Sequence, residues 1–300
     1  MKRIARILLT TILLFFSTLA GVGLITFGKE WQRHSGADCR VAVFMYHAVV
    51  PDSYPAQRFH IRHSVFLSHL TALATAGVLV PSPDDITTTS RSLRETILSW
   101  CSANDRIALI TFDAETPSFH GELSVPALSS HDMPAAFFVV TGTLDRDGWV
   151  SHDEIRIMLE SGMSVGSHSH THPLFTRLDP DSIYVELSLS SQRLKEVADV
   201  DEPMLALPGG RYDSATQEIA ARAGFRQIFT SDPCYVTADS RADQICRIEV
   251  RGDKGPTPLD FLNSPLALAW QSWSWLWKRR IESVMGLRLW DALQRYRSGY

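Results

Sequence analysis

Three histidines within five residues form the stretch of this chain best suited to chemistry. His168, His170 and His172 stand beside hydroxyl residues, just before Pro173. Imidazole is a common metal ligand, and two rings four residues apart converge on one helical turn or in a tight loop. We therefore predict that His168 and His172 bind a metal ion. A solvated, histidine-rich loop is the alternative interpretation, because short motifs often match by chance.

Other polar residues follow short apolar runs elsewhere in the chain. Such runs are typical of strands buried on both faces, and ligands of parallel sheets and barrels bind at the C-terminal ends of the strands. The residues in this position are His47, Asp113 and Pro208-Gly209-Gly210. We expect them to share one rim with His168 and His172, and this convergence strengthens the metal prediction.

Strands and helices alternate in the predicted pattern. We expect strands at 41–46, 107–112, 135–140, 204–207, 227–230 and 245–250, and helices at 64–80, 93–100, 151–160, 181–198 and 214–223. Ser151 followed by Glu154 is a typical helix N-terminus. The alternation implies parallel βαβ units and an α/β fold.

The composition is that of a globular protein. The chain has 300 residues, of which 45% are hydrophobic and 21% charged, and its net charge is −4. No basic cluster interleaved with aromatic residues appears in the middle of the chain. We therefore expect no nucleic-acid partner.

The N-terminus has the pattern of a membrane anchor. The run from Ile7 to Phe27 is uncharged, follows Lys2, Arg3 and Arg6, and matches the roughly 20 residues that span a bilayer. The positive-inside rule keeps the basic end cytoplasmic and places the rest on the periplasmic or extracytoplasmic side. A signal peptide cleaved after Ala20 is the alternative, but the apolar run continues past that point.

Four segments are predicted in all. Residues 1–28 form the basic end and anchor, 29–40 a polar tether, 41–262 the main domain, and 263–300 a Trp-rich amphipathic helical segment. In that last segment, tryptophans at helical spacing precede Lys278-Arg279-Arg280, a pattern that suits packing on the main domain or contact with a membrane interface.

Four cysteines could form disulfides in an exported chain. Cys234 and Cys246 close a short loop, which leaves Cys39 with Cys101. Four cysteines allow three pairings, and free thiols are a further alternative.

Five stretches in a fixed order carry a family resemblance. They are Val43-Phe44-Met45-Tyr46-His47, Thr111-Phe112-Asp113, Pro134 to Val139, Gly166 to Pro173, and Leu207 to Asp213. From about Val41 to Val250 the sequence resembles the polysaccharide deacetylases of carbohydrate esterase family four, in particular the exopolysaccharide-type members.

The resemblance implies a distorted (β/α) barrel, usually with seven strands. It also implies a divalent metal, often zinc, held by one carboxylate and two histidines. By position, His168 and His172 would be ligands and Asp113 the catalytic base. The expected activity is hydrolysis of acetyl groups from N-acetylated sugars of an envelope or extracellular polysaccharide, with polysaccharide export machinery as a further partner.

The sequence departs from the family pattern at three places. Ala114 replaces the aspartate that binds the metal, so either the longer Glu115 or Asp113 itself supplies the carboxylate. A neighbour on an extended strand points to the other face, which argues against Glu115. Ala206 replaces the arginine that orients the base. No late Leu-x-His supplies the acid, for which the candidates are His170, His47 and His120.

The remaining candidates would bind substrate. Pro208 and Gly210 permit close backbone approach, Tyr212 could stack on a sugar ring, and His47 ends the first strand at the same rim. A tight strand-to-helix turn is the alternative for the glycines. A catalytically impaired, glycan-binding member and a structural partner in polysaccharide export are the competing functions.

Overall fold

The computed structural model describes residues 23–32, 34–35, 39–55, 57–86, 91–115 and 117–285. They belong to two compact units. One is Asp38–Asn263, and the other combines the described parts of Met1–Ala37 and Ser264–Tyr300.

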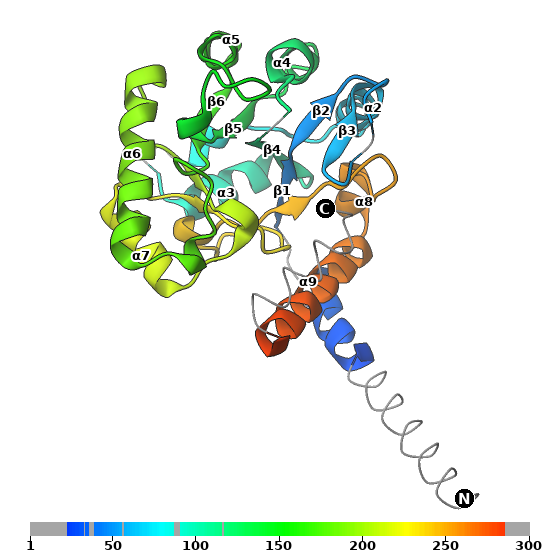
Figure 1. The fold of residues 1–300 in the computed structure, drawn as a ribbon. Helices are drawn as coiled ribbons and strands as arrows, with labels where there is room; N and C mark the ends of the chain where they lie inside the picture. The colour runs from blue at the N-terminus through cyan, green and yellow to red at the C-terminus, as the bar shows by residue number, and fades with distance from the viewer. Residues whose placement is uncertain are drawn as a thin grey trace, which may run out of the picture. The chain divides into compact units, whose positions relative to one another are not determined.

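The larger unit is built on a parallel sheet of seven strands in the order β8-β7-β6-β5-β4-β1-β9 (Figure 1). The strands are β1 Val41–Tyr46, β4 Ile107–Ala114, β5 Ala135–Val139, β6 Ser164–Ser167, β7 Leu205–Ala206, β8 Ile228–Phe229 and β9 Ile248–Glu249. A parallel bridge pairs Phe229 of β8 with Ile245, three residues before β9, so the two edges of the sheet meet. This curled sheet fits the predicted seven-stranded (β/α) barrel.

Helices connect the strands, as the alternating pattern predicts. They are α2 His63–Thr75, α3 Leu93–Ala103, α4 Val125–Ser129, α5 His152–Glu160, α6 Pro180–Ala198 and α7 Ser214–Arg222. Helix α8, Pro258–Asn263, follows the last strand. Ser151 and Glu154 form the predicted capping box of α5. Helix α2 ends earlier than predicted because Gly77 takes a left-handed conformation, with φ of 64°. The small sheet of β2, Ala48–Val50, and β3, His60–Arg62, was not predicted.

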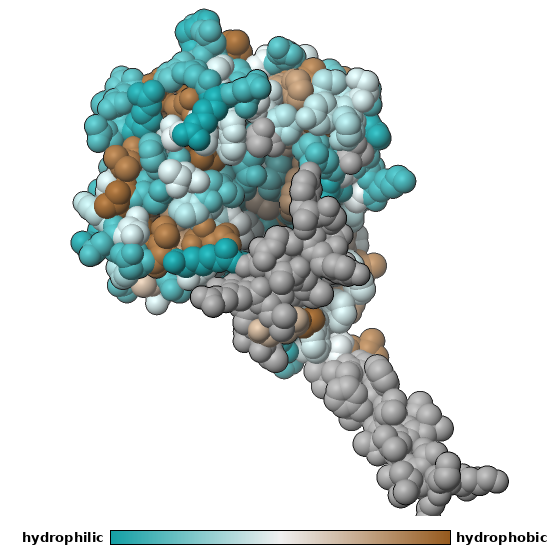
Figure 2. Space-filling model, viewed as in Figure 1, coloured by the Kyte–Doolittle hydropathy of each residue, from teal (hydrophilic) through white to brown (hydrophobic). Residues whose placement is uncertain are grey.

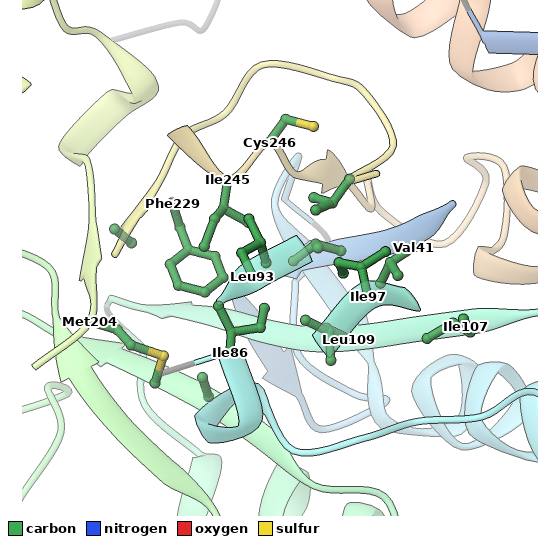
Figure 3. Packing of buried hydrophobic residues seen from close by; sticks show 14 of the residues in the cluster. Val41, Ile86, Leu93, Ile97, Ile107, Leu109, Met204, Phe229, Ile245 and Cys246 are labelled. Atoms are coloured by element: carbon green, nitrogen blue, oxygen red, sulfur yellow. The ribbon is translucent and has the colours of Figure 1, made fainter. Parts of the chain in front are cut away.

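The faces of β4 explain where the site lies. Ile107 and Leu109 belong to a buried apolar cluster with Val41 and Phe229 (Figure 3). Because side chains alternate along a strand, Thr111 and Asp113 continue the same face toward its C-terminal end. The barrel interior is therefore apolar at the start of β4 and polar at its end.

Both predicted disulfides are present. Cys39 pairs with Cys101 and Cys234 with Cys246, at Cα separations of 5.8 Å and 5.6 Å. The second one adjoins Arg247, which lies at the barrel interior.

The smaller unit contains α9, Pro265–Met285, and a helical stretch at 23–32 beside it (Figure 1). Trp273 Nε1 donates to the carbonyl of Gly23 at 3.1 Å and to Thr26 Oγ1 at 3.0 Å, and Ser272 donates to Glu30 at 2.6 Å. Residues 29–32 and 34–35 of the predicted tether are thus helical. Their packing partner comes from the other end of the chain, which sequence periodicity does not reveal.

The predicted anchor at Ile7–Phe27 lies mainly outside the described residues, as does the end of the C-terminal segment, 286–300. Within the described ranges, no helix is both long enough and apolar enough to cross a membrane. The anchor remains a prediction.

Candidate metal centre

The histidine motif forms a loop after β6. Ser169 and His172 have left-handed backbone conformations, with φ of 65° and 62°. Such angles are uncommon in residues other than glycine, and they often mark functional sites. They turn the chain so that the rings of His168 and His172 lie 4.7 Å apart, centroid to centroid.

Hydrogen bonds within and outside the motif hold this loop. Ser169 Oγ accepts from the backbone N–H of His172 at 2.9 Å. The carboxylate of Glu186, on α6, accepts from the N–H groups of His170 and Thr171 at 3.2 Å and 2.8 Å. The sequence offered no indication of this role of Glu186. A helical pattern does not show which of its acidic side chains bonds to a loop elsewhere in the fold.

Three side-chain atoms converge at this loop. Glu115 Oε1 lies 3.0 Å from His172 Nε2 and 3.4 Å from His168 Nε2, and the two nitrogens are 3.2 Å apart. Donors at about 2.1 Å from a tetrahedral ion stand about 3.4 Å from each other. These separations therefore fit three ligands of one small divalent cation.

The orientation of His168 supports this assignment. Its Nδ1 lies 2.9 Å from the carbonyl oxygen of Ala206, which can only accept, so Nδ1 carries the proton. Nε2 then presents a lone pair toward Glu115 and His172. A backbone carbonyl on the far nitrogen is a typical outer partner of a metal-binding histidine.

Glu115 reaches the histidines because β4 ends at Ala114. The backbone N–H of Glu115 bonds to the carbonyl of Asp113 at 2.9 Å, so the chain turns there and leaves the extended alternation. The objection that Glu115 would point elsewhere is therefore wrong. Asp113 is the more distant carboxylate, with Oδ2 lying 3.8 Å from His168 Nε2.

Asp113 is bound on both oxygens by Arg247. Nη1 donates to Oδ1 at 2.6 Å and Nη2 donates to Oδ2 at 3.0 Å, while Nε donates to the carbonyl of Thr230 at 2.9 Å. The Arg247 side chain is completely buried, and Asp113 is 4% exposed. This bidentate contact fixes the position of the carboxylate and favours its ionised form.

The charged groups of the site shift one another's pKa values. Burial opposes ionisation of Asp113, but the charges of Arg247 and His168 outweigh it and hold its pKa below the usual range. Burial likewise opposes ionisation of Glu115, yet the contacts to His168 and His172 lower its pKa. For His168, burial is outweighed by Asp113 and Glu115, which raise its pKa. Two carboxylates that favour a proton on His168 also favour a cation between these groups.

Arg247 is the functional residue that the sequence reasoning missed. Its position in Cys246-Arg247-Ile248-Glu249-Val250, an arginine inside an apolar strand pattern, was the available indication. Position 206, where the family pattern has an arginine, is an alanine here. Arg247 directly precedes β9, in the segment that pairs with β8 through Ile245, and it contacts Asp113 instead.

The three candidate acids differ in their surroundings. His47 follows β1, and the pairing of Tyr46 with Phe112 places it opposite Asp113. Its Nδ1 is buried and has no hydrogen-bond partner within the described part of the chain. His170 instead bonds through Nδ1 to Thr141 at 3.1 Å. His120 is completely buried, which keeps it from any substrate.

The predicted substrate-binding residues lie in a turn after β7. Gly209 and Gly210 both have φ of 62°, and a Cβ on Gly210 would collide with Ser231. A tight turn therefore accounts for these glycines after Pro208. The Tyr212 hydroxyl donates to Asp232 and accepts from Gln244 Nε2 at 2.7 Å. Contact of Pro208, Gly210, Tyr212 or His47 with a sugar stays a prediction.

A family model described as polysaccharide deacetylase matches residues 102–228, which include Asp113, Glu115 and the histidine loop. The predicted resemblance to the polysaccharide deacetylases is confirmed. A chitooligosaccharide deacetylase from a Bradyrhizobium species is 28% identical over 130 residues, which are 43% of this chain and 58% of the relative. The chain spans about half the length of the curated relatives it matches.

Two solved structures share the fold of the larger part of this chain. The Streptococcus pyogenes deacetylase PplD, in complex with acetate, matches 76% of this chain and 99% of its own with a TM-score of 0.65 and 21% identity. IcaB from Ammonifex degensii matches 79% of this chain and 98% of its own with a TM-score of 0.61 and 23% identity. At 21% and 23% identity these likenesses show the fold alone, and the chemistry has to be argued from the residues of the site.

Proposed function

We propose that this protein is a metal-dependent hydrolase that removes acetyl groups from N-acetylated sugars of an envelope or extracellular polysaccharide. One observation carries the proposal. Glu115, His168 and His172 present three metal-donor atoms beside Asp113, a buried carboxylate that Arg247 keeps ionised. The deacetylase names of the chitooligosaccharide relative and of PplD support this reaction class.

Glu115, His168 and His172 would hold the divalent metal, for which zinc suits the mixture of two imidazoles and one carboxylate. When bound, such an ion lowers the pKa of water toward about 7 and polarises a carbonyl group. Glu115 takes the place of the missing aspartate at Ala114. The exchange of donor residue leaves the donor set unchanged.

Asp113 is suited to act as the base. Its carboxylate lies 3.8 Å from His168 Nε2, next to the three donors, and its lowered pKa keeps it able to accept the proton of the attacking water. Arg247 prevents the carboxylate from rotating, because it engages both oxygens. The base is thus positioned before substrate arrives.

His47 is the candidate that best suits protonation of the departing amine. It directly follows Tyr46, which pairs with Phe112 just before Asp113, and it is partly exposed, unlike the buried His120. Its ring lies 4.7 Å from that of Phe59, which holds it from one side. Amide hydrolysis requires an acid for the departing amine and a base for the attacking water, and His47 and Asp113 would fill these two roles at the ends of adjacent strands.

The compartment follows from the N-terminus. The uncharged run at 7–27 after a basic end supports a membrane anchor with the barrel on the periplasmic or extracytoplasmic side. Two disulfides suit that compartment. Association with polysaccharide export machinery remains a prediction from the envelope substrate.

The test is deacetylation of N-acetylglucosamine oligomers by purified protein, measured as released acetate and free amine. We expect activity that disappears on chelation and returns with zinc, and that is lost in Glu115→Ala and in Asp113→Asn. Glycan binding without hydrolysis by a metal-loaded protein would instead establish the glycan-binding alternative.

A further inference from the structure

The smaller unit exposes large apolar side chains together with basic ones. Its exposed apolar residues, with Trp270 at 60% and Leu24 at 73% exposure among the most open, are Leu24, Ile25, Trp31, Leu266, Trp270 and Ile281. By contrast, the visible face of the larger unit is mainly hydrophilic, with apolar residues scattered over it (Figure 2). An exposed apolar group on a small two-helix unit indicates a binding surface.

Basic side chains lie over tryptophan rings near the end of α9. Arg279 lies over the ring of Trp275 at 4.8 Å and Arg280 over that of Trp277 at 5.9 Å. With Lys29 and Lys278, the described residues of this unit carry four basic side chains and two acidic ones, whereas the whole chain has a net charge of −4. The surface therefore suits an anionic partner.

The aromatic side chains are tied to the end of the apolar N-terminal run. Trp273 Nε1 bonds to the Gly23 carbonyl and to Thr26, and the Phe27 ring lies 6.3 Å from that of Trp270 and 6.5 Å from that of Trp273. Gly23, Thr26 and Phe27 lie among the last five residues of the uncharged run at 7–27. If that run spans a bilayer, its end lies at the membrane–water interface. The tryptophans bonded to it then lie at the same depth, where tryptophan is enriched in membrane proteins.

Buried polar contacts fix the pairing of the two helices. Ser272 donates to Glu30 at 2.6 Å, and His34 Nε2 lies 3.6 Å from the same carboxylate oxygen. Both Glu30 and His34 are buried. These contacts set the register between the two helices, and the same register places Trp273 of α9 beside Gly23.

We propose that this surface lies on an anionic lipid bilayer, with Trp270, Leu266 and Ile281 among the acyl chains near the interface and Lys278, Arg279 and Arg280 at the headgroups. Tryptophan with an adjacent basic cluster is the composition of interfacial helices. The charge suits an anionic headgroup, and the position of the tryptophans at the end of the apolar run favours lipid over a second copy of this chain. The proposal concerns attachment and leaves the hydrolytic reaction unaffected.

The test uses the full chain reconstituted into vesicles of phosphatidylcholine with phosphatidylglycerol. A nitroxide spin label is attached at Trp270→Cys, at Ile281→Cys or, as a control, at Leu189→Cys, an exposed position on α6. Collision with oxygen, which concentrates in lipid, is compared with collision with a water-soluble nickel chelate. We expect several-fold more oxygen contact and several-fold less nickel contact at 270 and 281 than at 189 in the same vesicles.

A charge variant tests the headgroup contact. Lys278→Glu/Arg279→Glu/Arg280→Glu should abolish the preference for phosphatidylglycerol over phosphatidylcholine vesicles. The matched control Arg91→Glu/Arg222→Glu/Arg226→Glu changes the net charge equally at exposed sites of the larger unit and should retain it. Deacetylation of soluble oligomers should be the same in both.

Two results would overturn the proposal. Nickel contact at 270 as high as at 189 in the same vesicles would show that the surface stays in water. Exclusion of both oxygen and nickel would show a protein partner, including a second copy. Neither result would affect the proposed hydrolysis, which is measured on a soluble substrate.

Discussion

Arg247 binds both carboxylate oxygens of Asp113 at 2.6 Å and 3.0 Å inside the barrel. The two residues are 134 positions apart in the sequence. Further donors of Arg247 are used by Thr230 and Thr111, and its guanidinium lies over the Phe138 ring at 5.5 Å. A buried charge pair with its remaining donors satisfied is tolerated, whereas one partner left alone is strongly unfavourable.

Replacement of Arg247 should therefore affect both stability and catalysis. Arg247→Ala leaves Asp113 as an uncompensated buried charge, which costs about 3–5 kcal/mol in the free energy of unfolding. Loss of the positioned base should lower kcat by on the order of 10²-fold or more. Denaturant unfolding and steady-state kinetics measure the two effects.

The double variant Arg247→Met/Asp113→Leu separates the effect on stability from the effect on catalysis, because it removes both charges. It should recover most of the stability without recovering activity. A fully active Arg247→Ala would contradict the positioning role. Arg226→Ala, at an exposed position of the same unit, is the control for loss of an arginine.

Metal content should distinguish the histidines of one loop. His172→Ala removes a proposed donor and should lower metal affinity sharply, whereas His170→Ala should leave it unchanged because His170 bonds to Thr141. Metal analysis after equilibrium dialysis provides the measurement. Equal metal loss in both variants would point to collapse of the loop instead of loss of a ligand.

Replacement of Glu115 and replacement of Asp113 should have different effects on metal content. Glu115→Gln should lose metal, since an amide oxygen is a poorer ligand for zinc than a carboxylate. Asp113→Asn should keep the metal and lose activity, because the amide cannot accept the proton. A metal-free Asp113→Asn protein beside a metal-loaded Glu115→Gln protein would reverse our assignment of the two carboxylates.

The two disulfides should have different effects on activity. They close loops with sequence separations of 62 and 12, for which chain entropy predicts stabilisation of about 4 and about 3 kcal/mol. Cys246 directly precedes Arg247, so Cys234→Ser/Cys246→Ser should lower kcat at temperatures where the protein stays folded. Cys39→Ser/Cys101→Ser, which loses at least as much stability, is the control and should retain kcat.

Acid should destabilise the protein partly through His120. Burial lowers its pKa from 6.5 to about 4, with a smaller opposing effect of Glu154. Because the unfolded chain binds this proton more readily, the stability present above pH 6.5 is lost as the pH falls toward 4. One such shift amounts to about 3 kcal/mol at pH 4.

His120→Gln does not titrate in this range, so its stability should fall less between pH 7 and pH 4.5 than that of the wild type. Urea unfolding at both pH values measures the difference, and a uniform offset between the two proteins would exclude a contribution of His120. His60 and His69, whose pKa values burial also lowers, are the same in both proteins and cancel in the comparison.

Local patterns in the sequence predicted the elements and most of the site. The apolar runs gave strands such as β1 and β4, because a strand buried on both faces needs nonpolar residues throughout. The spacing of His168 and His172 predicted two converging imidazole rings, and the strand end at Asp113 predicted a carboxylate at the same rim, whereas the role of Asp113 as base was implied by the family resemblance. These features depend on neighbours in the chain, and a sequence displays neighbours directly.

The tertiary structure decided the rest, because it depends on contacts between distant residues. The end of β4 at Ala114 lets Glu115 turn to the histidines. Closure of the sheet through Ile245 brings Arg247 to Asp113, in place of an arginine at 206. The pairing of Trp273 with Gly23 joins the two ends of the chain. A sequence shows which residues can form such contacts, and only the folded chain brings them within bonding distance.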